Sequence, residues 1–125
     1  HRLVHGMHRA IAALSQAGNC VVADHVLVEP EWVTDCANVL ADLPAWLIGV
    51  RCPLPVLVER ERSRGDRTLG QAAAQHERVH AHGFYDFEVD TSTMSPEACA
   101  LAIRQAVEHD PPLALRQIRD RRPAS

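Results

Sequence analysis

Residues 46–52, Trp-Leu-Ile-Gly-Val-Arg-Cys, decide the fold class of this 125-residue chain. Apolar residues fill the segment up to Arg51, which is typical of a strand buried in a parallel sheet with helices on both sides. Two more segments predict strands: residues 20–23, Cys-Val-Val-Ala, directly before Asp24, and residues 87–91, Phe-Glu-Val-Asp-Thr. The chain is therefore expected to form a sheet of parallel strands.

Helical segments alternate with these strands. Apolar residues recur at three- and four-residue spacing between Val4 and Leu14, and prolines at positions 30, 53 and 55 stand where further helices are expected to begin. Residues 70–81 predict another helix, and Ser95-Pro96-Glu97 is a favourable start for the last one. This alternation predicts an α/β fold of βαβ units, with one domain over residues 1–109 and a loosely ordered, Arg-rich tail over residues 110–125.

Composition excludes several classes of protein. A net charge of -3 gives no electrostatic reason to bind nucleic acid, and no apolar stretch is long enough to span a bilayer. No secretory signal is recognisable, and the four cysteines lack C-x-x-C spacing, so a reducing, cytoplasmic setting is expected. The first residue is His1 rather than Met, which suggests that the chain begins partway through a longer reading frame.

Polar residues follow the predicted strands. Asp24 and His25 follow the first, Arg51 lies near the end of the second, and Asp90 precedes Thr91 at the end of the third. Ligands of open α/β sheets bind beyond the carboxyl ends of the strands. An acid at the end of a buried strand can hold Mg²⁺ directly or through water, but a solvated acid gives the same pattern. Both interpretations of Asp24 remain open at this point.

A cluster of arginines lies between the second and third strands, at positions 60, 62, 64 and 67. Guanidinium groups bind phosphate oxygens in pairs and stay charged, which suits a mobile lid over a transferring phosphoryl group. The alternative is a charged helix end in which Glu59 and Glu61 neutralise their neighbours. All thirteen basic residues are Arg, so the chain cannot supply the Lys of a phosphate-binding loop. His76 and His80 share a helix face, but a zinc site needs further ligands, and the spacing disfavours a metalloprotease.

Taken together, these segments resemble the chloramphenicol phosphotransferase-like family of P-loop kinases. The resemblance runs to about Val107 and rests on residues 6–10 and 17–19, 21–27, 49–53, 59–67, 70–72, 79–80, 85–92 and 95–97. It implies a three-layer P-loop kinase-like parallel sheet, incomplete here because the strands that carry the Walker A loop would lie before His1. It also implies ATP-dependent phosphorylation of a small-molecule hydroxyl, with chloramphenicol as the acceptor of the namesake enzymes and antibiotic inactivation as the role.

The resemblance also implies roles for individual residues. Asp24 corresponds to the strand-end acid near Mg²⁺, and Arg60, Arg64 and Arg67 correspond to lid arginines that face the ATP phosphates. Thr91 and Ser92 correspond to part of the loop on the adenine side, whereas Gln75 and His80 match the family pattern without an assigned role.

The missing loop has two expected consequences. Positioning and electrostatic stabilisation supply most of the catalysis in phosphoryl transfer, so we expect this chain alone to be inactive. The sheet would also lack its central strand, and exposed edges favour marginal stability and self-association. The alternatives are another P-loop kinase, such as an adenylylsulfate kinase, and a non-catalytic nucleotide-binding or interaction module.

Overall fold

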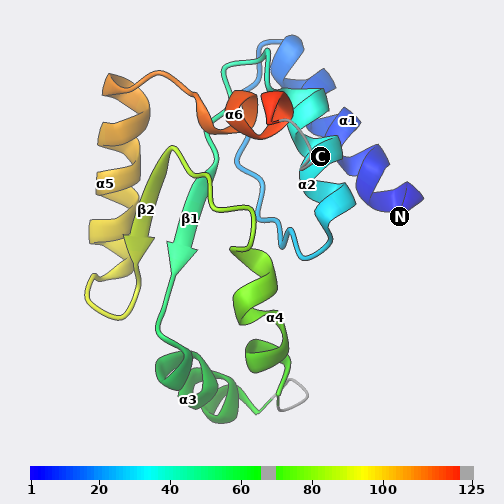
Figure 1. Ribbon diagram of the computed structural model, residues 1–125. Helices are drawn as coiled ribbons and strands as arrows, with labels where there is room; N and C mark the ends of the chain where they lie inside the picture. Colours follow the sequence, from blue (N-terminus) through cyan, green and yellow to red (C-terminus); the bar gives the residue numbers. More distant parts are fainter. Residues whose placement is uncertain (66–69, 122–125) are drawn as a thin grey trace.

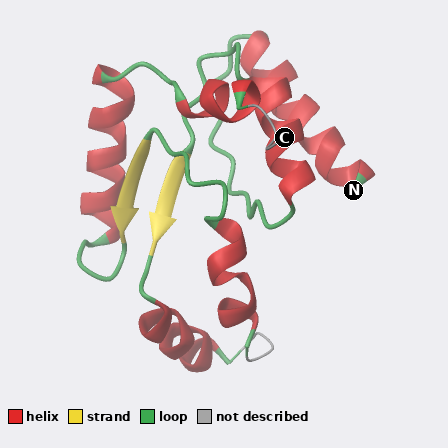
Figure 2. Ribbon diagram, viewed as in Figure 1, coloured by secondary structure: helices red, strands yellow, loops and turns green. Residues whose placement is uncertain are grey.

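The computed structural model describes residues 1–65 and 70–121, in which six helices accompany two strands (Figures 1 and 2). The elements follow the order α1 (Arg2–Gln16), α2 (Pro30–Leu40), β1 (Ile48–Arg51), α3 (Leu54–Arg64), α4 (Gln71–Val79), β2 (Phe87–Asp90), α5 (Pro96–His109) and α6 (Ala114–Asp120). The predicted α/β class is confirmed. Two strands do not establish a three-layer, kinase-like arrangement, which stays a prediction.

The two strands pair in parallel, as the alternation of strand and helix predicted. Ile48 lies opposite Phe87 and Arg51 opposite Asp90, so both strands end at the same edge of the sheet. The connection between them passes through α3 and α4, and α5 packs against β2 (Figure 1). Because the strands are parallel, the segments that follow β1 and β2 begin side by side.

The prediction of a strand at residues 20–23 is wrong. This segment lies between α1 and α2 and forms no strand, and Val22 is 95% exposed. A strand requires a hydrogen-bonded neighbour, and within the described residues β1 pairs with β2 alone. An apolar run favours the extended conformation of a strand. Whether it joins a sheet depends on whether another strand lies beside it and accepts its backbone hydrogen bonds.

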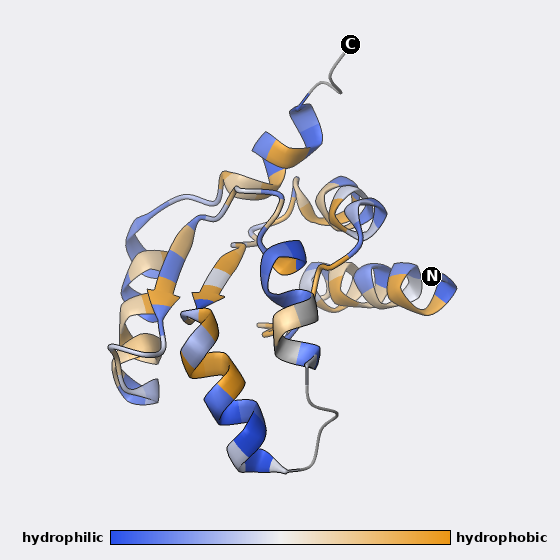
Figure 3. Ribbon diagram, turned by 60° about the horizontal axis from the view of Figure 1, so that its bottom comes forward, coloured by the Kyte–Doolittle hydropathy of each residue, from blue (hydrophilic) through white to orange (hydrophobic). Residues whose placement is uncertain are grey.

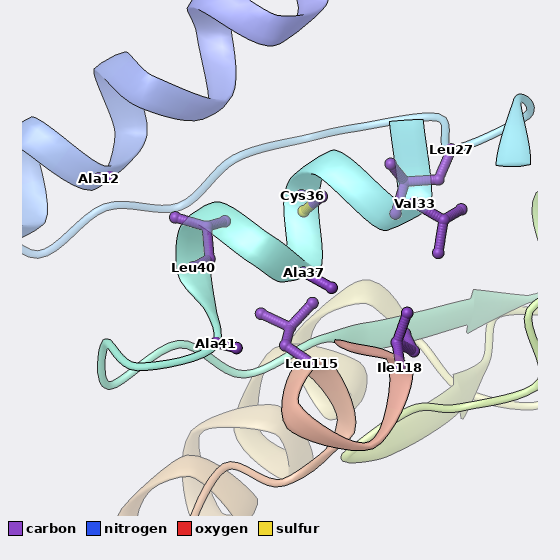
Figure 4. Packing of buried hydrophobic residues seen from close by; sticks show 9 residues of the cluster. All are labelled: Ala12, Leu27, Val33, Cys36, Ala37, Leu40, Ala41, Leu115 and Ile118. Carbon is purple, nitrogen blue, oxygen red and sulfur yellow. The ribbon is translucent and has the colours of Figure 1, made fainter. Parts of the chain in front are cut away.

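The largest buried cluster centres on α2 (Figure 4). Cys36, Ala37 and Leu40 of α2 contribute to it, together with Ala12 of α1 and Leu115 of α6. Outside this cluster, Cys52 after β1, Val89 of β2 and Cys99 of α5 are also buried. The apolar faces of three helices therefore form most of the core, rather than the faces of a wide sheet.

The Arg-rich end of the chain, for which a loosely ordered tail over residues 110–125 stays a prediction, contains a short helix in its described part. Residues Ala114–Asp120 form α6, in which Leu115 and Ile118 are buried against α2. The carboxylate of Asp86 accepts hydrogen bonds from the backbone N–H groups of Leu113 (2.7 Å) and Ala114 (2.9 Å), which satisfies donors at the start of this helix. Leu115 and Ile118 stand three residues apart and are the sequence signal that was missed. Residues 122–125 lie outside the described part.

Two helices show how local sequence sets their limits. The Ser95 Oγ accepts a hydrogen bond from the N–H of Ala98 at 3.1 Å, so the predicted start of α5 is confirmed. Helix α3 changes from apolar to charged along its length (Figure 3). It ends at Gly65, whose φ of 68° suits glycine at a helix end. In the described residues, no helix has the length and apolar character that crossing a bilayer requires.

Candidate functional site

The turn after β2 is held in a defined conformation by its own hydrogen bonds. The Asp90 Oδ1 accepts hydrogen bonds from the Ser92 N–H at 2.8 Å and from the Ser92 Oγ at 2.5 Å, and these bonds lower the pKa of Asp90. The Thr91 N–H donates to the Arg51 carbonyl at 3.0 Å, which joins the turn to the end of β1. Thr91 and Ser92 therefore lie at the carboxyl edge of the sheet, where α/β proteins bind ligands.

Arg60 of α3 lies against this turn. Its Nη1 donates to the Thr91 Oγ1 at 2.8 Å, and its Nη2 donates to the Thr91 carbonyl at 2.8 Å. The structure thus brings together a predicted lid arginine and a predicted adenine-side residue that are 31 positions apart. A guanidinium has five N–H donors. Two of them are engaged here, and the side chain is exposed, so donors remain for an anionic ligand.

The other arginines of the predicted lid have different surroundings. Arg64 is exposed in the last turn of α3, and Arg67 lies outside the described residues. Arg62 forms an ion pair with Glu59 at 3.8 Å, as expected for a charged helix end. Glu61 is different: it is only 4% exposed, and its Oε1 accepts a hydrogen bond from the Gly70 N–H at 2.7 Å. This carboxylate therefore connects α3 to the start of α4, a role that was not predicted.

Two hollows open at the carboxyl edge of the sheet. The larger has a volume of about 500 Å³ and is lined by Val50, Cys52, Leu57, Arg60, Thr91, Met94, Pro96 and Cys99. The smaller has a volume of about 260 Å³ and is lined by Arg51, Cys52, Pro53, His76, His80 and Asp90. The larger hollow combines an apolar wall with one cation and one hydroxyl, a composition that suits an organic ligand with an anionic group.

Tyr85 packs against Gly49 of β1. Its hydroxyl lies 2.6 Å from the His80 Nδ1, and the His82 ring meets its edge with the centroids 4.7 Å apart. Burial lowers the pKa of both histidines and raises the pKa of Tyr85. His80, which matched the family pattern without a role, therefore holds a tyrosine that packs on Gly49 of β1. No group of three or more potential metal ligands occurs among the described residues.

Asp24 stands apart from this edge. It is exposed on the segment between α1 and α2, and within residues 1–65 and 70–121 no hydrogen bond or ion pair joins it to Arg60 or Thr91. An exposed carboxylate is a suitable ligand for Mg²⁺, which proteins usually bind through one or two carboxylates together with phosphate oxygens and water. The carboxylate of Asp24 is therefore chemically suited to bind Mg²⁺.

A second polar cluster, which sequence reasoning missed, lies beside Asp24. It consists of His8 of α1, Asp35 of α2 and His25, and His8 is completely buried. The His8 Nδ1 lies 2.6 Å from the Asp35 Oδ2, and its Nε2 lies 2.8 Å from the His25 Nε2. A histidine on the apolar face of an amphipathic helix was the available signal, because a buried imidazole requires polar partners.

The fold and this edge define an α/β protein in which an arginine on the connection between two parallel strands contacts the turn after the second strand. Residues 1–108 match the family described as chloramphenicol phosphotransferase-like protein, and the chain belongs to this family. The family predicted from the sequence is thereby confirmed.

Two relatives come from Mycobacterium tuberculosis, one from strain CDC 1551 / Oshkosh and one from strain ATCC 25618 / H37Rv. Each carries the name "Putative O-phosphotransferase" and is 32% identical to this chain over 119 residues. The match covers 94% of this chain but 53% of each relative. The chain therefore spans about half the length of the curated relatives it matches.

Proposed function

We propose that this chain contributes the lid and the adenine-side turn of an ATP-dependent phosphotransferase that phosphorylates a hydroxyl group of a small molecule, with chloramphenicol as the candidate acceptor. Antibiotic inactivation in the cytoplasm would be its role. The observation that carries the proposal is the contact of the Arg60 guanidinium with Thr91 at the carboxyl edge of the sheet. Membership of the family and the name of the mycobacterial relatives support the phosphotransferase chemistry.

Each residue of this chain would act by position and charge. Arg60 would offer its remaining N–H donors to phosphate oxygens, and a cation placed there stabilises negative charge that develops during transfer. Thr91 would keep the guanidinium in place, because it accepts from both terminal nitrogens. The apolar wall formed by Val50, Leu57 and Met94 would exclude water from one side of the nucleotide.

ATP would supply the transferred phosphoryl group, and Mg²⁺ would neutralise charge on its phosphates. Asp24 is the residue of this chain that would hold the metal, directly or through water. This part of the proposal rests on the chemistry of an exposed carboxylate on the segment between α1 and α2.

We further propose that the 125-residue chain alone does not turn over ATP. It contains no Lys to place on the phosphates, and positioning of those phosphates supplies most of the rate in phosphoryl transfer. Purified chain assayed with ATP, Mg²⁺ and chloramphenicol should release no more product than a boiled control. Turnover above that control contradicts the proposal.

The role of Arg60 can be tested in a longer protein that contains this chain and a phosphate-binding loop. Arg60→Ala should lower kcat/KM for ATP by about 10²- to 10³-fold, the usual loss for one transition-state donor. Arg60→Lys keeps the charge but loses the paired contact with Thr91, so it should restore only part of the rate. The matched control is Arg62→Ala, because Arg62 is exposed and pairs with Glu59. Equal rates for Arg60→Ala and Arg62→Ala would refute a phosphate-binding role.

A further inference from the structure

Glu61 is the one buried residue in the charged second half of α3. It is 4% exposed, whereas the side chain of Glu59 on the same helix is 68% exposed. Burying a carboxyl group costs free energy unless hydrogen bonds compensate for the water that it loses. The Glu61 Oε1 accepts such a bond from the Gly70 N–H at 2.7 Å. The position of this carboxyl group is therefore tied to the start of α4.

Helix α3 has few attachments to the rest of the molecule. It begins soon after β1 and lies beyond the carboxyl ends of both strands (Figure 1). Among the helices and strands that the structure describes, α3 packs mainly against α4. The Arg60 guanidinium adds a second attachment through its two hydrogen bonds with Thr91.

The two side-chain attachments point in different directions. Arg60 and Glu61 are consecutive, so their side chains leave the helix about 100° apart around its axis. Arg60 reaches the turn after β2, and Glu61 reaches the start of α4. Two attachments in different directions fix the rotation of a helix about its axis, which neither could do alone.

The partner of Glu61 is itself held to the sheet. Gly70 stands at the start of α4, and His80 stands at the end of the same helix. The His80 Nδ1 lies 2.6 Å from the Tyr85 hydroxyl, and the Tyr85 ring packs on Gly49 of β1. Glu61 therefore connects α3 to β1 by way of α4.

We propose that Glu61 is a positioning residue for Arg60. By accepting the hydrogen bond of Gly70, it keeps α3 in the rotation that places the Arg60 guanidinium against Thr91. Gly70 is exposed, so water can replace the lost acceptor in a variant, and the expected effect is on geometry. The consequence for phosphoryl transfer rests on the proposed function, in which Arg60 binds phosphate. The positioning itself does not depend on that function.

Three variants of the 125-residue chain test the positioning without any activity assay. Glu61→Met keeps the length of the side chain but has no oxygen to accept the hydrogen bond of Gly70. Glu61→Gln keeps an amide oxygen at the same place, so it should rescue the contact. The matched control is Glu59→Met, because it removes the same charge from an exposed side chain of the same helix.

The ¹⁵N signals of the Arg60 guanidinium are the measurement. Its two terminal nitrogens bond to different atoms of Thr91, so they should give separate signals in the unmodified chain. Rotation about the Cζ–Nε bond averages the two signals once the contact is lost. We expect one averaged signal in Glu61→Met and separate signals in both Glu61→Gln and Glu59→Met. Separate signals that persist in Glu61→Met, or averaged signals in Glu61→Gln, overturn the proposal.

Hydrogen exchange in the unmodified chain gives a test that does not depend on the folding of any variant. The Gly70 amide should exchange at least about 10-fold more slowly than a free amide, because the Glu61 Oε1 accepts its hydrogen bond. A Gly70 amide that exchanges at the free rate refutes the positioning role.

A longer protein with kinase activity distinguishes positioning from a merely structural role. Glu61→Met should lower kcat/KM for ATP by about 10-fold, since a small displacement of a positioned group is costly, and Glu61→Gln should restore most of it. In an Arg60→Ala background Glu61→Met should lower kcat/KM no further, because its effect passes through Arg60. Equal losses in both backgrounds overturn the positioning role.

The positioning role and the proposed function can fail separately. If Arg60→Ala leaves the rate unchanged, the proposed function fails, and the Arg60 signals of the 125-residue chain still decide the positioning role. If Arg60→Ala lowers the rate but Glu61→Met leaves the Arg60 signals separate, the positioning role fails and the proposed function stands.

Discussion

Replacement of Leu115 by Ala tests whether α6 belongs to the folded domain. Leu115 is 4% exposed in the cluster around α2, and burial of a leucine at such a site makes its truncation cost about 2–5 kcal/mol. Because α6 is a short helix at the surface, its neighbours can partly close the cavity, and we expect about 2–3 kcal/mol. That is a large fraction of the roughly 5–15 kcal/mol by which a typical domain is stable.

Urea denaturation followed by circular dichroism measures this loss. With a denaturant slope of about 2 kcal/mol per molar, the midpoint should fall by about 1–1.5 M. The control is Leu113→Ala, which removes the same atoms two residues away from a side chain that is 51% exposed. Its midpoint should change by no more than about 0.25 M, since exposed substitutions stay within about 0.5 kcal/mol. Equal midpoints for the two variants would refute the packing of α6 and would support the prediction of a loosely ordered tail.

Two further predictions concern the sheet and the buried histidines. Gly49→Ala places a Cβ 2.8 Å from the Tyr85 ring and should lower the free energy of unfolding, measured by urea denaturation, by about 1–3 kcal/mol. The control is Gly6→Ala on α1, which has open space around it and should raise the free energy of unfolding by about 0.5–1 kcal/mol. An unchanged stability of Gly49→Ala would contradict the close packing of Tyr85 on β1. Burial lowers the folded-state pKa of His25, His80 and His82 below the ordinary value of 6.5. The unfolded chain therefore binds more protons than the folded chain, and the free energy of unfolding should fall as the pH drops below about 6.5. Constant or rising stability between pH 7.5 and 5.5 would show that these rings are not held neutral.

Most helices were predictable because their signals are local. Ser95 with Pro96 predicted the start of α5. Gly65 was not predicted as a helix end, but it ends α3 in a backbone conformation that glycine adopts without strain. The parallel pairing of β1 and β2 followed from the alternation of strands with helices. Residues 20–23 show the limit of this reasoning, because an apolar run cannot specify whether another strand lies beside it.

The candidate site was predicted in part. Arg60 and Thr91 were both named from the sequence, but their contact depends on how α3 folds back beside the end of β2. Asp24 was expected at the same edge, and the structure leaves it on a separate, exposed segment. The roles assigned to these residues stay predictions, as does the division at residue 110.

The amino-acid sequence by itself determined the family, the helices α1 to α5, the strands β1 and β2, and the arginines available to bind phosphate, because each depends on residue types at short spacing. Only the tertiary structure decided that Glu61 joins α3 to α4, that Asp86 holds the start of α6, and that His8 meets Asp35 and His25. Each of these polar groups is buried or partly buried and needs a partner that lies far away in the sequence or on another element. Such partners are selected when distant segments pack together, and no local pattern records them.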